Sequence, residues 1–331
     1  MTLPDVLRQI VERRRERFGV ATDGPLKVGD RKPSGGSPRT DLSAETRRPP
    51  STARSGPVGG SGVNPFLAAL RAPAPGRRRI VAEIKMGSPR IGSLAGRVDP
   101  LAQARLYAEG GAAALSVVVE PDHFHGSWEL LAACREVSGL PAIAKDFVVH
   151  PRQLELARAA GADAVLLIAA LYSAPELAAW AGRARALGLV PLVETHDEGD
   201  LAKLAAAAEE GGRWELVGIN NRDLRTFEVD VERSARLAAR LPAGAIRVAE
   251  SGISSAADVD RLAAAGFDAF LVGEALLLAD DPAAKLAELV STAGGELSAT
   301  GGEPSAAGGE STSSRGSAAT EGSHGSAKEG G

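Results

Sequence analysis

Short apolar runs alternate with longer stretches rich in alanine and leucine through the middle of the chain, from Arg79 to Ser291. The apolar runs carry many Val and Ile residues, as expected for strands that are buried on both faces. They predict strands at 79–85, 114–119, 142–145, 164–168, 190–194, 216–220, 246–250 and 269–272. The intervening stretches place apolar residues at helical spacing and predict helices at 100–110, 127–137, 151–160, 174–187, 197–209, 231–240, 255–265 and 282–291.

The order of these elements predicts the fold. Eight strands that are each followed by a helix match the (β/α)8 TIM barrel, an α/β fold in which helices surround a closed parallel sheet. A doubly wound open sheet is the alternative. That fold more often has a G-x-G-x-x-G loop after its first strand, whereas this chain continues with Met86-Gly87-Ser88-Pro89.

The first 20 residues predict a separate amphipathic helix. Leu3, Leu7, Ile10 and Val11 recur at near-helical spacing, and the pattern ends at Phe18. Arginines occupy the other face of this helix, and we expect that face to be exposed to solvent.

The remaining segments differ from the barrel in composition. Many Pro, Gly, Ser and Thr residues follow the first helix, which predicts a flexible linker. The C-terminal segment is rich in Gly, Ser and Ala and has no aromatic residue, so burial cannot offset its ordering entropy and we expect disorder. The predicted organisation is an N-terminal helix at 1–20, a linker at 21–62, the barrel at 63–293 and a tail at 294–331.

Composition narrows the class of protein. The chain has 331 residues, a formal net charge of −4 and a pI of about 5.9. This balance, with dispersed basic residues, argues against a nucleic-acid partner. No apolar stretch approaches the ~20 residues of a membrane-spanning helix, and no secretory signal follows the N-terminal arginines. The single cysteine, Cys134, excludes an internal disulfide, so we expect a soluble cytoplasmic protein.

Charged residues end the first predicted strand. Side chains alternate along a strand, so Glu83 and Lys85 face the same way, while Ala82 and Ile84 face the surrounding helices. A carboxylate and an ammonium therefore point into the barrel from one strand. Burying two ions costs several kcal/mol unless they are well paired, which favours a functional role over packing alone. A buried ion pair that stabilises the barrel mouth is the structural alternative.

The same pattern returns at four other strand ends, with Lys145, Glu194, Asn220 and Glu250. The C-terminal ends of barrel strands form the active site in enzymes of this fold. Any one of these residues could instead form a turn or cap a helix. Together they predict an acid/base site whose catalytic candidates are Glu83, Lys85, Lys145, Glu194, Asn220 and Glu250.

Two glycine-containing turns follow the seventh and eighth strands. They contain Ser251 with Gly252, and Gly273 with Glu274. Loops at these two places in a TIM barrel often bind phosphate through backbone N–H groups. Either glycine alone could be an ordinary turn residue.

Other polar residues are weaker candidates. His123 and His125 lie two apart without surrounding carboxylates at metal-ligand spacing, so we expect a loop and no metal site. His196 reaches the site only if the chain turns directly after Glu194. Cys134 lies in a predicted helix and is expected to pack in the core.

Eight short motifs occur in order between Ala82 and Glu274. They are Ala82-Glu83-Ile84-Lys85 with Ser88-Pro89, Phe124-His125-Gly126-Ser127, Lys145-Asp146-Phe147, Ala164 to Ile168, Leu192-Val193-Glu194, Gly218-Ile219-Asn220-Asn221-Arg222-Asp223-Leu224, Ala249-Glu250-Ser251-Gly252-Ile253 and Val272-Gly273-Glu274. This ordered set resembles the indole-3-glycerol phosphate synthase family of tryptophan biosynthesis. The first helix and Asn64-Pro65-Phe66-Leu67 are similar to the family's N-terminal extension, which implies that they cover the barrel mouth.

The resemblance implies a carbon–carbon lyase that needs no metal and no organic cofactor. The family converts 1-(2-carboxyphenylamino)-1-deoxyribulose 5-phosphate to indole-3-glycerol phosphate, with loss of CO2 and water. By resemblance, Lys145 is the acid of ring closure. The later dehydration needs an acid for the leaving hydroxyl and a base for the ring nitrogen proton, and Glu194, Lys85 and Glu83 all remain open for these roles.

The resemblance also implies the substrate contacts. Asn220 and Glu250 would position substrate hydroxyls and catalytic side chains. The implied phosphate and ring contacts are Lys85, Ser88, Pro89, Phe124, Phe147, Arg222, Ser251, Gly252, Gly273 and Glu274. The implied partner is a small phosphorylated substrate, with other enzymes of the tryptophan pathway as further candidates.

Three positions depart from the family pattern and bear on substrate affinity. Met86 and Gly87 stand where the family usually has a basic and then a small residue, and Val119 stands where it has a hydroxyl. Two alternatives remain: another phosphate-binding barrel enzyme, or a non-catalytic barrel. A phosphoribosylanthranilate isomerase would need a Cys base near the first strand, whereas Cys134 follows the second.

Overall fold

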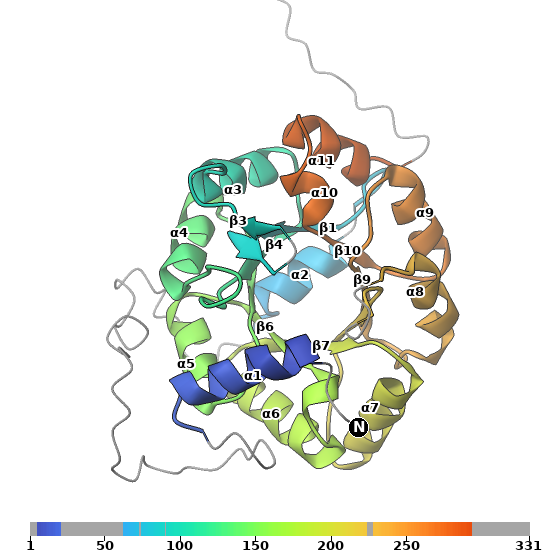
Figure 1. Ribbon diagram of the computed structural model, residues 1–331. Helices are drawn as coiled ribbons and strands as arrows, with labels where there is room; N and C mark the ends of the chain where they lie inside the picture. Colours follow the sequence, from blue (N-terminus) through green and yellow to red (C-terminus); the bar gives the residue numbers. More distant parts are fainter. Residues whose placement is uncertain (1–4, 21–61, 73, 90, 224–227, 293–331) are drawn as a thin grey trace, which may run out of the picture. The chain divides into compact units, whose positions relative to one another are not determined.

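The computed structural model describes residues 5–20, 62–72, 74–89, 91–223 and 228–292. Within these ranges eight parallel strands close into a barrel, in which β1 pairs with both β4 and β10. The barrel strands are β1 (Ile80–Ile84), β4 (Ala114–Val118), β5 (Ala142–Lys145), β6 (Ala164–Ile168), β7 (Val190–Thr195), β8 (Leu216–Asn220), β9 (Ile246–Glu250) and β10 (Ala269–Val272). The predicted TIM barrel is therefore confirmed, and the open sheet is excluded (Figure 1).

A helix follows each barrel strand. The helices of the ring are α3 (Pro100–Glu109), α4 (Trp128–Ser138), α5 (Pro151–Ala159), α6 (Ala174–Ala186), α7 (Glu198–Glu209), α8 (Val231–Leu237), α9 (Ala256–Ala264) and α11 (Pro282–Val290), with 3-10 turns at η1 (Ala169–Leu171) and η2 (Ala238–Arg240) and the short α10 (Glu274–Leu277). Their starts are set by side chains that cap the first free N–H groups, as Asp99, Ser127, Ser255 and Asp281 do. None of the described helices is long and apolar enough to cross a membrane.

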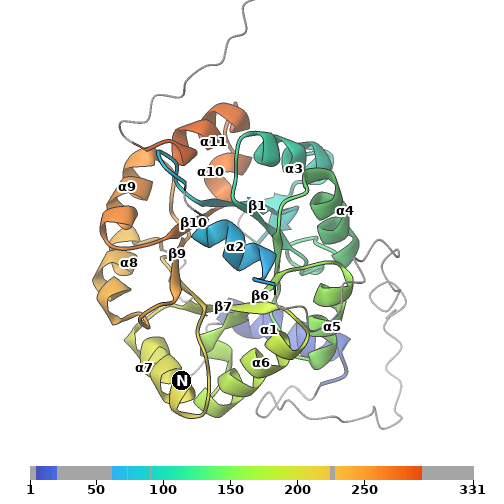
Figure 2. The ribbon, with the colours of Figure 1, turned by 180° about the vertical axis from the view of Figure 1, so that it is seen from behind.

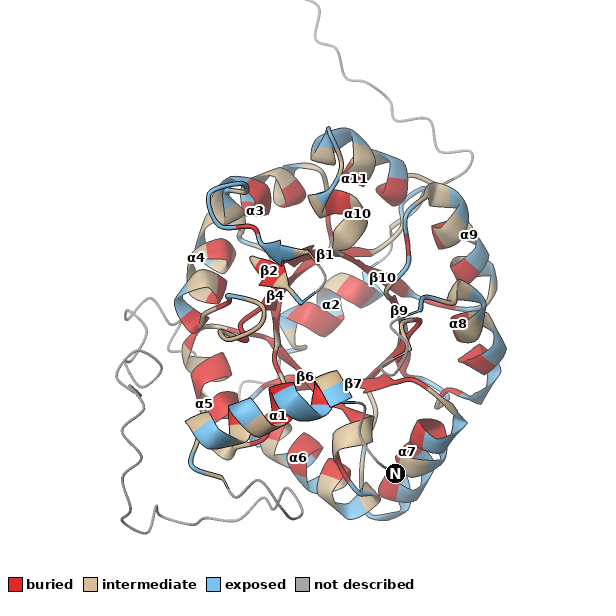
Figure 3. Cartoon of the chain, viewed as in Figure 1, coloured by how far each residue is buried: buried red, intermediate tan, exposed pale blue. Residues whose placement is uncertain are grey.

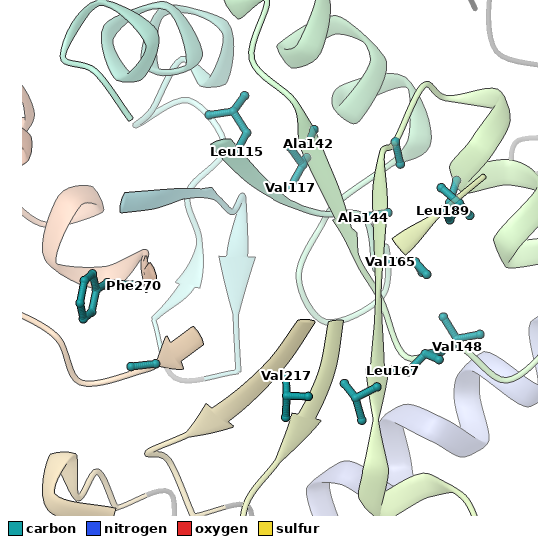
Figure 4. Packing of buried hydrophobic residues seen from close by; sticks show 14 of the residues in the cluster. Leu115, Val117, Ala142, Ala144, Val148, Val165, Leu167, Leu189, Val217 and Phe270 are labelled. Atoms are coloured by element: carbon teal, nitrogen blue, oxygen red, sulfur yellow. The ribbon is translucent and has the colours of Figure 1, made fainter. Parts of the chain in front are cut away.

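Alternation along the strands divides the apolar residues into two layers. Ile80, Ala82 and Ile84 pack outward against the helices, in the cluster shown in Figure 4. Val81, on the same strand, points into the barrel and joins an inner apolar cluster. Figure 3 shows buried residues along the strands and on the inward faces of the ring helices. The inner cluster leaves the upper, C-terminal strand ends free for polar side chains.

Helix α2 (Pro65–Arg71) closes the lower end of the barrel, where the strands begin (Figure 2). Its residues Phe66, Leu67 and Leu70 belong to the inner apolar cluster. The side chain of Asn64 caps this helix and donates hydrogen bonds to the carbonyl oxygens of Asp163 (2.9 Å) and of Gly188 (3.3 Å), which precede β6 and β7. The expectation that this segment covers the mouth is wrong, because its apolar side chains fit the apolar lower end.

Helix α1 (Asp5–Arg17) lies instead on the mouth side (Figures 1 and 2). Arg14 is fully buried, and its guanidinium binds the carboxylate of Asp146, directly after β5. Arg17 binds Asp122 in the loop after β4. The prediction of a wholly solvent-exposed arginine face is therefore wrong for these two residues, because each has a carboxylate on the barrel.

The hairpin after β1 consists of β2 (Gly87–Ser88) and β3 (Gly92–Ser93), which pair antiparallel. The sequence pattern does not predict these two-residue strands. The predicted linker, except for Gly62, and the predicted tail at 294–331 lie outside the described residues.

Candidate active site

Six polar side chains meet at the C-terminal end of the barrel, and they are the six catalytic candidates predicted from the sequence. Glu83 lies on β1 and Lys85 directly after it. The others end β5, β8 and β9 or lie one residue before the end of β7: Lys145, Asn220, Glu250 and Glu194. Register places Asn220 beside Glu250, because their Cα atoms are partners on β8 and β9. The side chains that carry a carboxylate or an amide are all buried: Glu83, Glu194, Asn220 and Glu250.

An ion-pair chain joins the two lysines. Nζ of Lys85 lies 2.9 Å from Oε1 of Glu83, and Nζ of Lys145 lies 3.6 Å from Oε2 of the same carboxylate. Lys145 also donates a hydrogen bond of 3.0 Å to Oε2 of Glu250. Glu83 therefore lies between two ammonium groups, and Lys145 lies between two carboxylates.

Burial and neighbouring charges set the protonation of this chain. Burial opposes ionisation of Glu83, but Lys85 and then Lys145 outweigh it and lower the pKa of this carboxyl. Burial likewise opposes the charge of Lys145, but Glu250 and Glu83 outweigh it and raise the pKa of the ammonium above its ordinary value. Both groups are therefore charged at neutral pH.

Two carboxylates of the site have pKa values on opposite sides of the ordinary value. Burial raises the pKa of Glu250 to about 7, and repulsion from Glu194 adds to the effect of burial, although Lys145 opposes it. Burial also opposes the ionisation of Glu194, but His196 outweighs it and lowers the pKa of Glu194 to about 2. Carboxyl groups with separated pKa values can serve as a proton acceptor and a proton donor in one site.

Two glycines give these carboxylates room. A Cβ atom on Gly218 of β8 would lie 2.1 Å from Oε1 of Glu250. A Cβ atom on Gly273, directly after β10, would lie 2.5 Å from Oε1 of Glu83. Such distances are too short for real contacts, so the backbone must lack a side chain at both positions.

His196 does reach the site. The chain turns after β7, and Nε2 of His196 lies 3.2 Å from Oε1 of Glu194. Asp200, in the first turn of α7, lies on the other side of the imidazole. His196 is a candidate from the sequence, whereas Asp200 is not. The spacing of four residues, which places Asp200 in the first turn of the next helix, could have indicated it.

The loops around the mouth supply the predicted substrate-contact residues. The rings of Phe124 and Phe147, from the loops after β4 and β5, lie 6.1 Å apart. Nη2 of Arg222 lies 3.6 Å from Oε2 of Glu274, which links the segments after β8 and β10. The backbone N–H of Arg222 also donates to Oδ1 of Asn220 (3.0 Å) and so orients that amide.

The remaining predicted contacts lie on turns. Ser251 and Gly252 have consecutive positive φ angles of 68° and 75°, so both residues adopt the left-handed conformation directly after β9. Ser88 accepts a hydrogen bond from the backbone N–H of Ile91 within its own hairpin (3.2 Å), and Pro89 is exposed at the tip. Ser88 and Pro89 therefore lie on a separate hairpin, and within the described part of the chain no hydrogen bond or ion pair joins them to the charged cluster.

Two departures from the family pattern have structural explanations. Val119 packs in the outer apolar cluster, so the missing hydroxyl lies away from the barrel interior. A Cβ atom on Gly87 would lie 2.5 Å from Cδ2 of His125, so this glycine makes room for the imidazole. The structure gives no reason for Met86.

The histidine and cysteine candidates behave as loop and core residues. His125 has a positive φ of 55° in the loop after β4, and no set of three or more His, Cys, Asp or Glu residues in the described ranges could hold a metal ion. Cys134 is buried on α4, and burial raises the pKa of its thiol to about 12. A thiol base for the isomerase alternative is therefore not available from Cys134, which does not lie at the mouth.

A closed (β/α)8 barrel with a buried acid/base cluster at its C-terminal mouth defines a TIM-barrel enzyme. The family model of indole-3-glycerol phosphate synthase matches residues 58–289, and the chain belongs to this family. The relative from Parafrankia sp. (strain EAN1pec), an indole-3-glycerol phosphate synthase, is 48% identical over 228 residues, which cover 69% of this chain and 82% of the relative. Two further relatives have the same name. The one from Koribacter versatilis is 44% identical over 211 residues, which cover 64% of this chain and 79% of the relative. The one from Mycobacterium avium is 45% identical over 228 residues, which cover 69% of this chain and 80% of the relative.

Proposed function

We propose that this chain is an indole-3-glycerol phosphate synthase, a carboxy-lyase of tryptophan biosynthesis. It converts 1-(2-carboxyphenylamino)-1-deoxyribulose 5-phosphate to indole-3-glycerol phosphate, CO2 and water. Family membership supports the reaction. The structural observation that carries the proposal is the partly buried ammonium of Lys145, held between the carboxylates of Glu83 and Glu250 at the barrel mouth.

Lys145 is the acid of ring closure. The aromatic carbon that bears the carboxylate attacks the ketone carbon, and the carbonyl oxygen takes the proton of Lys145 as the new carbon–carbon bond forms. The alkoxide that develops there is more basic than an amine, so the high pKa of Lys145 does not prevent transfer. CO2 then leaves, and the electron pair of the broken bond restores the aromatic ring.

Lys85 and Glu194 carry out the dehydration. Lys85 protonates the new hydroxyl, which leaves as water, and Glu194 accepts a proton from the resulting cationic five-membered ring. A cationic intermediate is strongly acidic, so a carboxylate with a low pKa suffices as base. Glu83 binds both ammonium groups and holds them at the barrel mouth. Asn220 and Glu250 position substrate hydroxyls and Lys145.

The loops around the mouth bind the two ends of the substrate. Backbone N–H groups of Ser251, Gly252, Gly273 and Glu274 bind the phosphate, with charge from Arg222 and Lys85. The two consecutive left-handed residues after β9 support this phosphate site, because a turn of this kind points successive backbone N–H groups toward one side. Phe124 and Phe147, with Ser88 and Pro89 from the hairpin, surround the anthranilate ring.

The reaction needs neither a metal nor an organic cofactor. The partner is the small phosphorylated substrate, with no nucleic acid or membrane involved, and other tryptophan-pathway enzymes are the candidate protein partners. We place the enzyme in the cytoplasm. The proposed barrel domain spans 63–293, and α1 docks on its mouth side through Arg14 and Arg17. From composition alone we propose a linker at 21–62 and a tail at 294–331.

Fluorescence of the indole product tests the function directly. Purified protein is mixed with the carboxyphenylamino substrate, and the rise in indole fluorescence and release of CO2 are followed together. Equal amounts of indole-3-glycerol phosphate and CO2 are expected from the parent, and a far lower rate from Lys145→Met. Absence of both products from folded parent protein would overturn the proposal.

A further inference from the structure

A second charged cluster lies directly behind Glu194. Nδ1 of His196 lies 3.5 Å from Oδ2 of Asp200, while its Nε2 lies 3.2 Å from Oε1 of Glu194. Lys203, one turn along α7, lies 3.4 Å from Oδ1 of Asp200 and donates to the carbonyl oxygen of Ala169 at 2.6 Å. The imidazole therefore lies between two carboxylates, one in the proposed active site and one outside it.

The backbone fixes this arrangement. The backbone N–H of His196 donates to Oδ2 of Asp200 (3.1 Å), and Asp197 caps α7 by accepting from the N–H of Asp200 (2.9 Å). Thr195 donates from its hydroxyl to the carbonyl oxygen of Gly218 on β8 (2.8 Å). The turn between β7 and α7 is thus tied at each residue, which places the imidazole beside Glu194.

The cluster is buried. His196 is 7% exposed, and Glu194 and Asp200 are each 3% exposed. A neutral imidazole between two buried carboxylates would leave both charges without a close cation on this side, which is costly. An imidazolium balances them, with Lys203 as the outer counter-charge.

The titration behaviour agrees with the geometry. Burial by itself disfavours the charged imidazole, but Asp200 and Glu194 outweigh it and raise the pKa of His196 to about 9. The pKa of Asp200 is lowered despite burial, by His196 and Lys203. The other groups that face Glu194 are Lys145 from β5, Asn220 from β8 and Glu250 from β9.

We infer that His196 is a positioning residue for the proposed dehydration step: as an imidazolium fixed between Asp200 and Glu194, it holds the ionised Glu194 in place. This inference rests on the proposed function for its catalytic meaning. It assigns His196 no direct contact with the substrate.

His196→Gln tests the inference, because glutamine keeps a side-chain N–H donor but cannot carry charge. Loss of a neighbouring opposite charge raises a carboxyl pKa by about 1–3 units. The acidic limb of the kcat–pH profile should therefore move upward by about that amount, since Glu194 must be ionised to accept a proton. In Asp200→Asn the imidazole stays protonated at the low pH of this limb, so this variant should not move the limb upward.

His150→Gln is the matched control. His150 precedes α5, where its ring accepts from the N–H of Arg152 and stacks on Phe18, away from the two carboxylates. Its replacement removes the same chemical group and should leave the acidic limb of kcat in place. The inference would be overturned if the acidic limb of the kcat–pH profile lay at the same pH in the parent and in folded His196→Gln.

A second measurement does not depend on turnover. Nitrogen-15 NMR of the imidazoles in the parent, with the His196 signals assigned by their loss in His196→Gln, should show His196 doubly protonated at pH 7. In Asp200→Asn its titration should move to lower pH. A neutral His196 at pH 7 would defeat the inference even if the enzyme is active, whereas a charged His196 in a protein without turnover would defeat only the proposed function.

Discussion

At the scale of single residues, one ammonium organises the proposed chemistry. Lys145 has carboxylates on two sides, and one of them, Glu83, also binds Lys85. This alternation of charges lets buried ions remain ionised, because each has a close counter-charge. It also fixes the direction of the donating N–H bonds.

Lys145→Met should abolish most of the turnover while leaving binding nearly intact. Methionine keeps the length and the packing of the stem but has no proton to donate. General acid catalysis typically contributes ~100- to 10,000-fold, so kcat should fall by about that factor with little change in KM. Steady-state kinetics, with circular dichroism to confirm folding, measures this.

Lys145→Arg is the companion variant. It keeps the positive charge between Glu83 and Glu250, but guanidinium is a poor proton donor near neutral pH, so it should not restore kcat. A folded Lys145→Met enzyme within about threefold of the parent kcat would shift the acid role to Lys85, because so small a loss lies far below the general-acid range.

Gly218→Ala should damage the site through a single methyl group. The added Cβ would overlap Oε1 of Glu250 at 2.1 Å, and overpacking of this kind costs about 1–3 kcal/mol. We expect lower stability to urea and a lower kcat, since Glu250 must move away from Lys145.

Gly182→Ala is the control: this exposed glycine in α6 has nothing within 4 Å of the added Cβ, so helix propensity should stabilise the variant by up to about 1 kcal/mol. Equal effects of the two substitutions would contradict the role given to Gly218.

The sequence predicts the inward-facing residues of the site well and their partners poorly. Glu83, Lys145 and Glu250 are recognisable because each is a charge at the end of an apolar strand, where alternation fixes its direction. Arg14 and Asp146 are 132 residues apart, and no local pattern relates them. His196 could be singled out, but its contacts depend on a turn that alternation cannot describe.

At the scale of elements, α1 docks through apolar and charged contacts together, because Leu7, Ile10 and Val11 are buried along with Arg14. Arg14 is buried against Asp146, which also accepts from Nε2 of Gln153 (2.7 Å), and the guanidinium lies over the ring of Phe18. Asp146 directly follows Lys145, so the helix is tied to the strand end that carries the proposed acid.

Arg14→Met should therefore both destabilise the protein and lower its activity. Removing one partner of a buried ion pair costs about 3–5 kcal/mol, because the remaining charge is left uncompensated. We expect a lower Tm and a reduced kcat from the same substitution. Thermal unfolding followed by circular dichroism, with steady-state kinetics well below Tm, measures both.

Arg8→Met is the matched control on the same helix. Arg8 pairs with Asp5, and both side chains are largely exposed, at 48% and 81%. Exposed pairs contribute at most about 1 kcal/mol, so Tm and kcat should stay close to the parent. If Arg14→Met behaved like Arg8→Met, the buried pair would not be what holds α1.

The sequence predicts where the helices and strands begin and end. It does not predict which end of the barrel α1 and α2 cover. Strand limits agree with the predicted ones to about a residue, because the apolar period and the capping residues define them. Phe66, Leu67 and Leu70 are plainly apolar, yet their pattern does not say that they fill the lower end of the barrel. The β2–β3 hairpin is too short for any period to be visible.

At the scale of the whole molecule, buried titratable groups make stability depend on pH in a predictable direction. A group whose pKa is raised by folding stabilises the protein below its unfolded pKa, and that contribution is lost as pH rises through the folded value. Glu250, with a pKa raised to about 7, acts in this way. Glu194 has the opposite sign: its pKa is lowered to about 2, so its contribution is present above the ordinary value of 4.5 and is lost in acid.

The contribution of His196 should be visible on the alkaline side. Its pKa is raised from 6.5 to about 9, so the stabilisation that it supplies is complete below pH 6.5 and disappears as pH rises toward 9. At 1.36 kcal/mol per pKa unit this loss amounts to about 3 kcal/mol at most. Urea unfolding of the parent at a series of pH values should therefore show falling stability across this window, and His196→Gln should flatten it. His150→Gln should keep the decline, because burial lowers the pKa of His150 and its contribution has the opposite sign. A parent whose free energy of unfolding is constant from pH 6.5 to 9 would show that the imidazolium between Glu194 and Asp200 does not stabilise the fold.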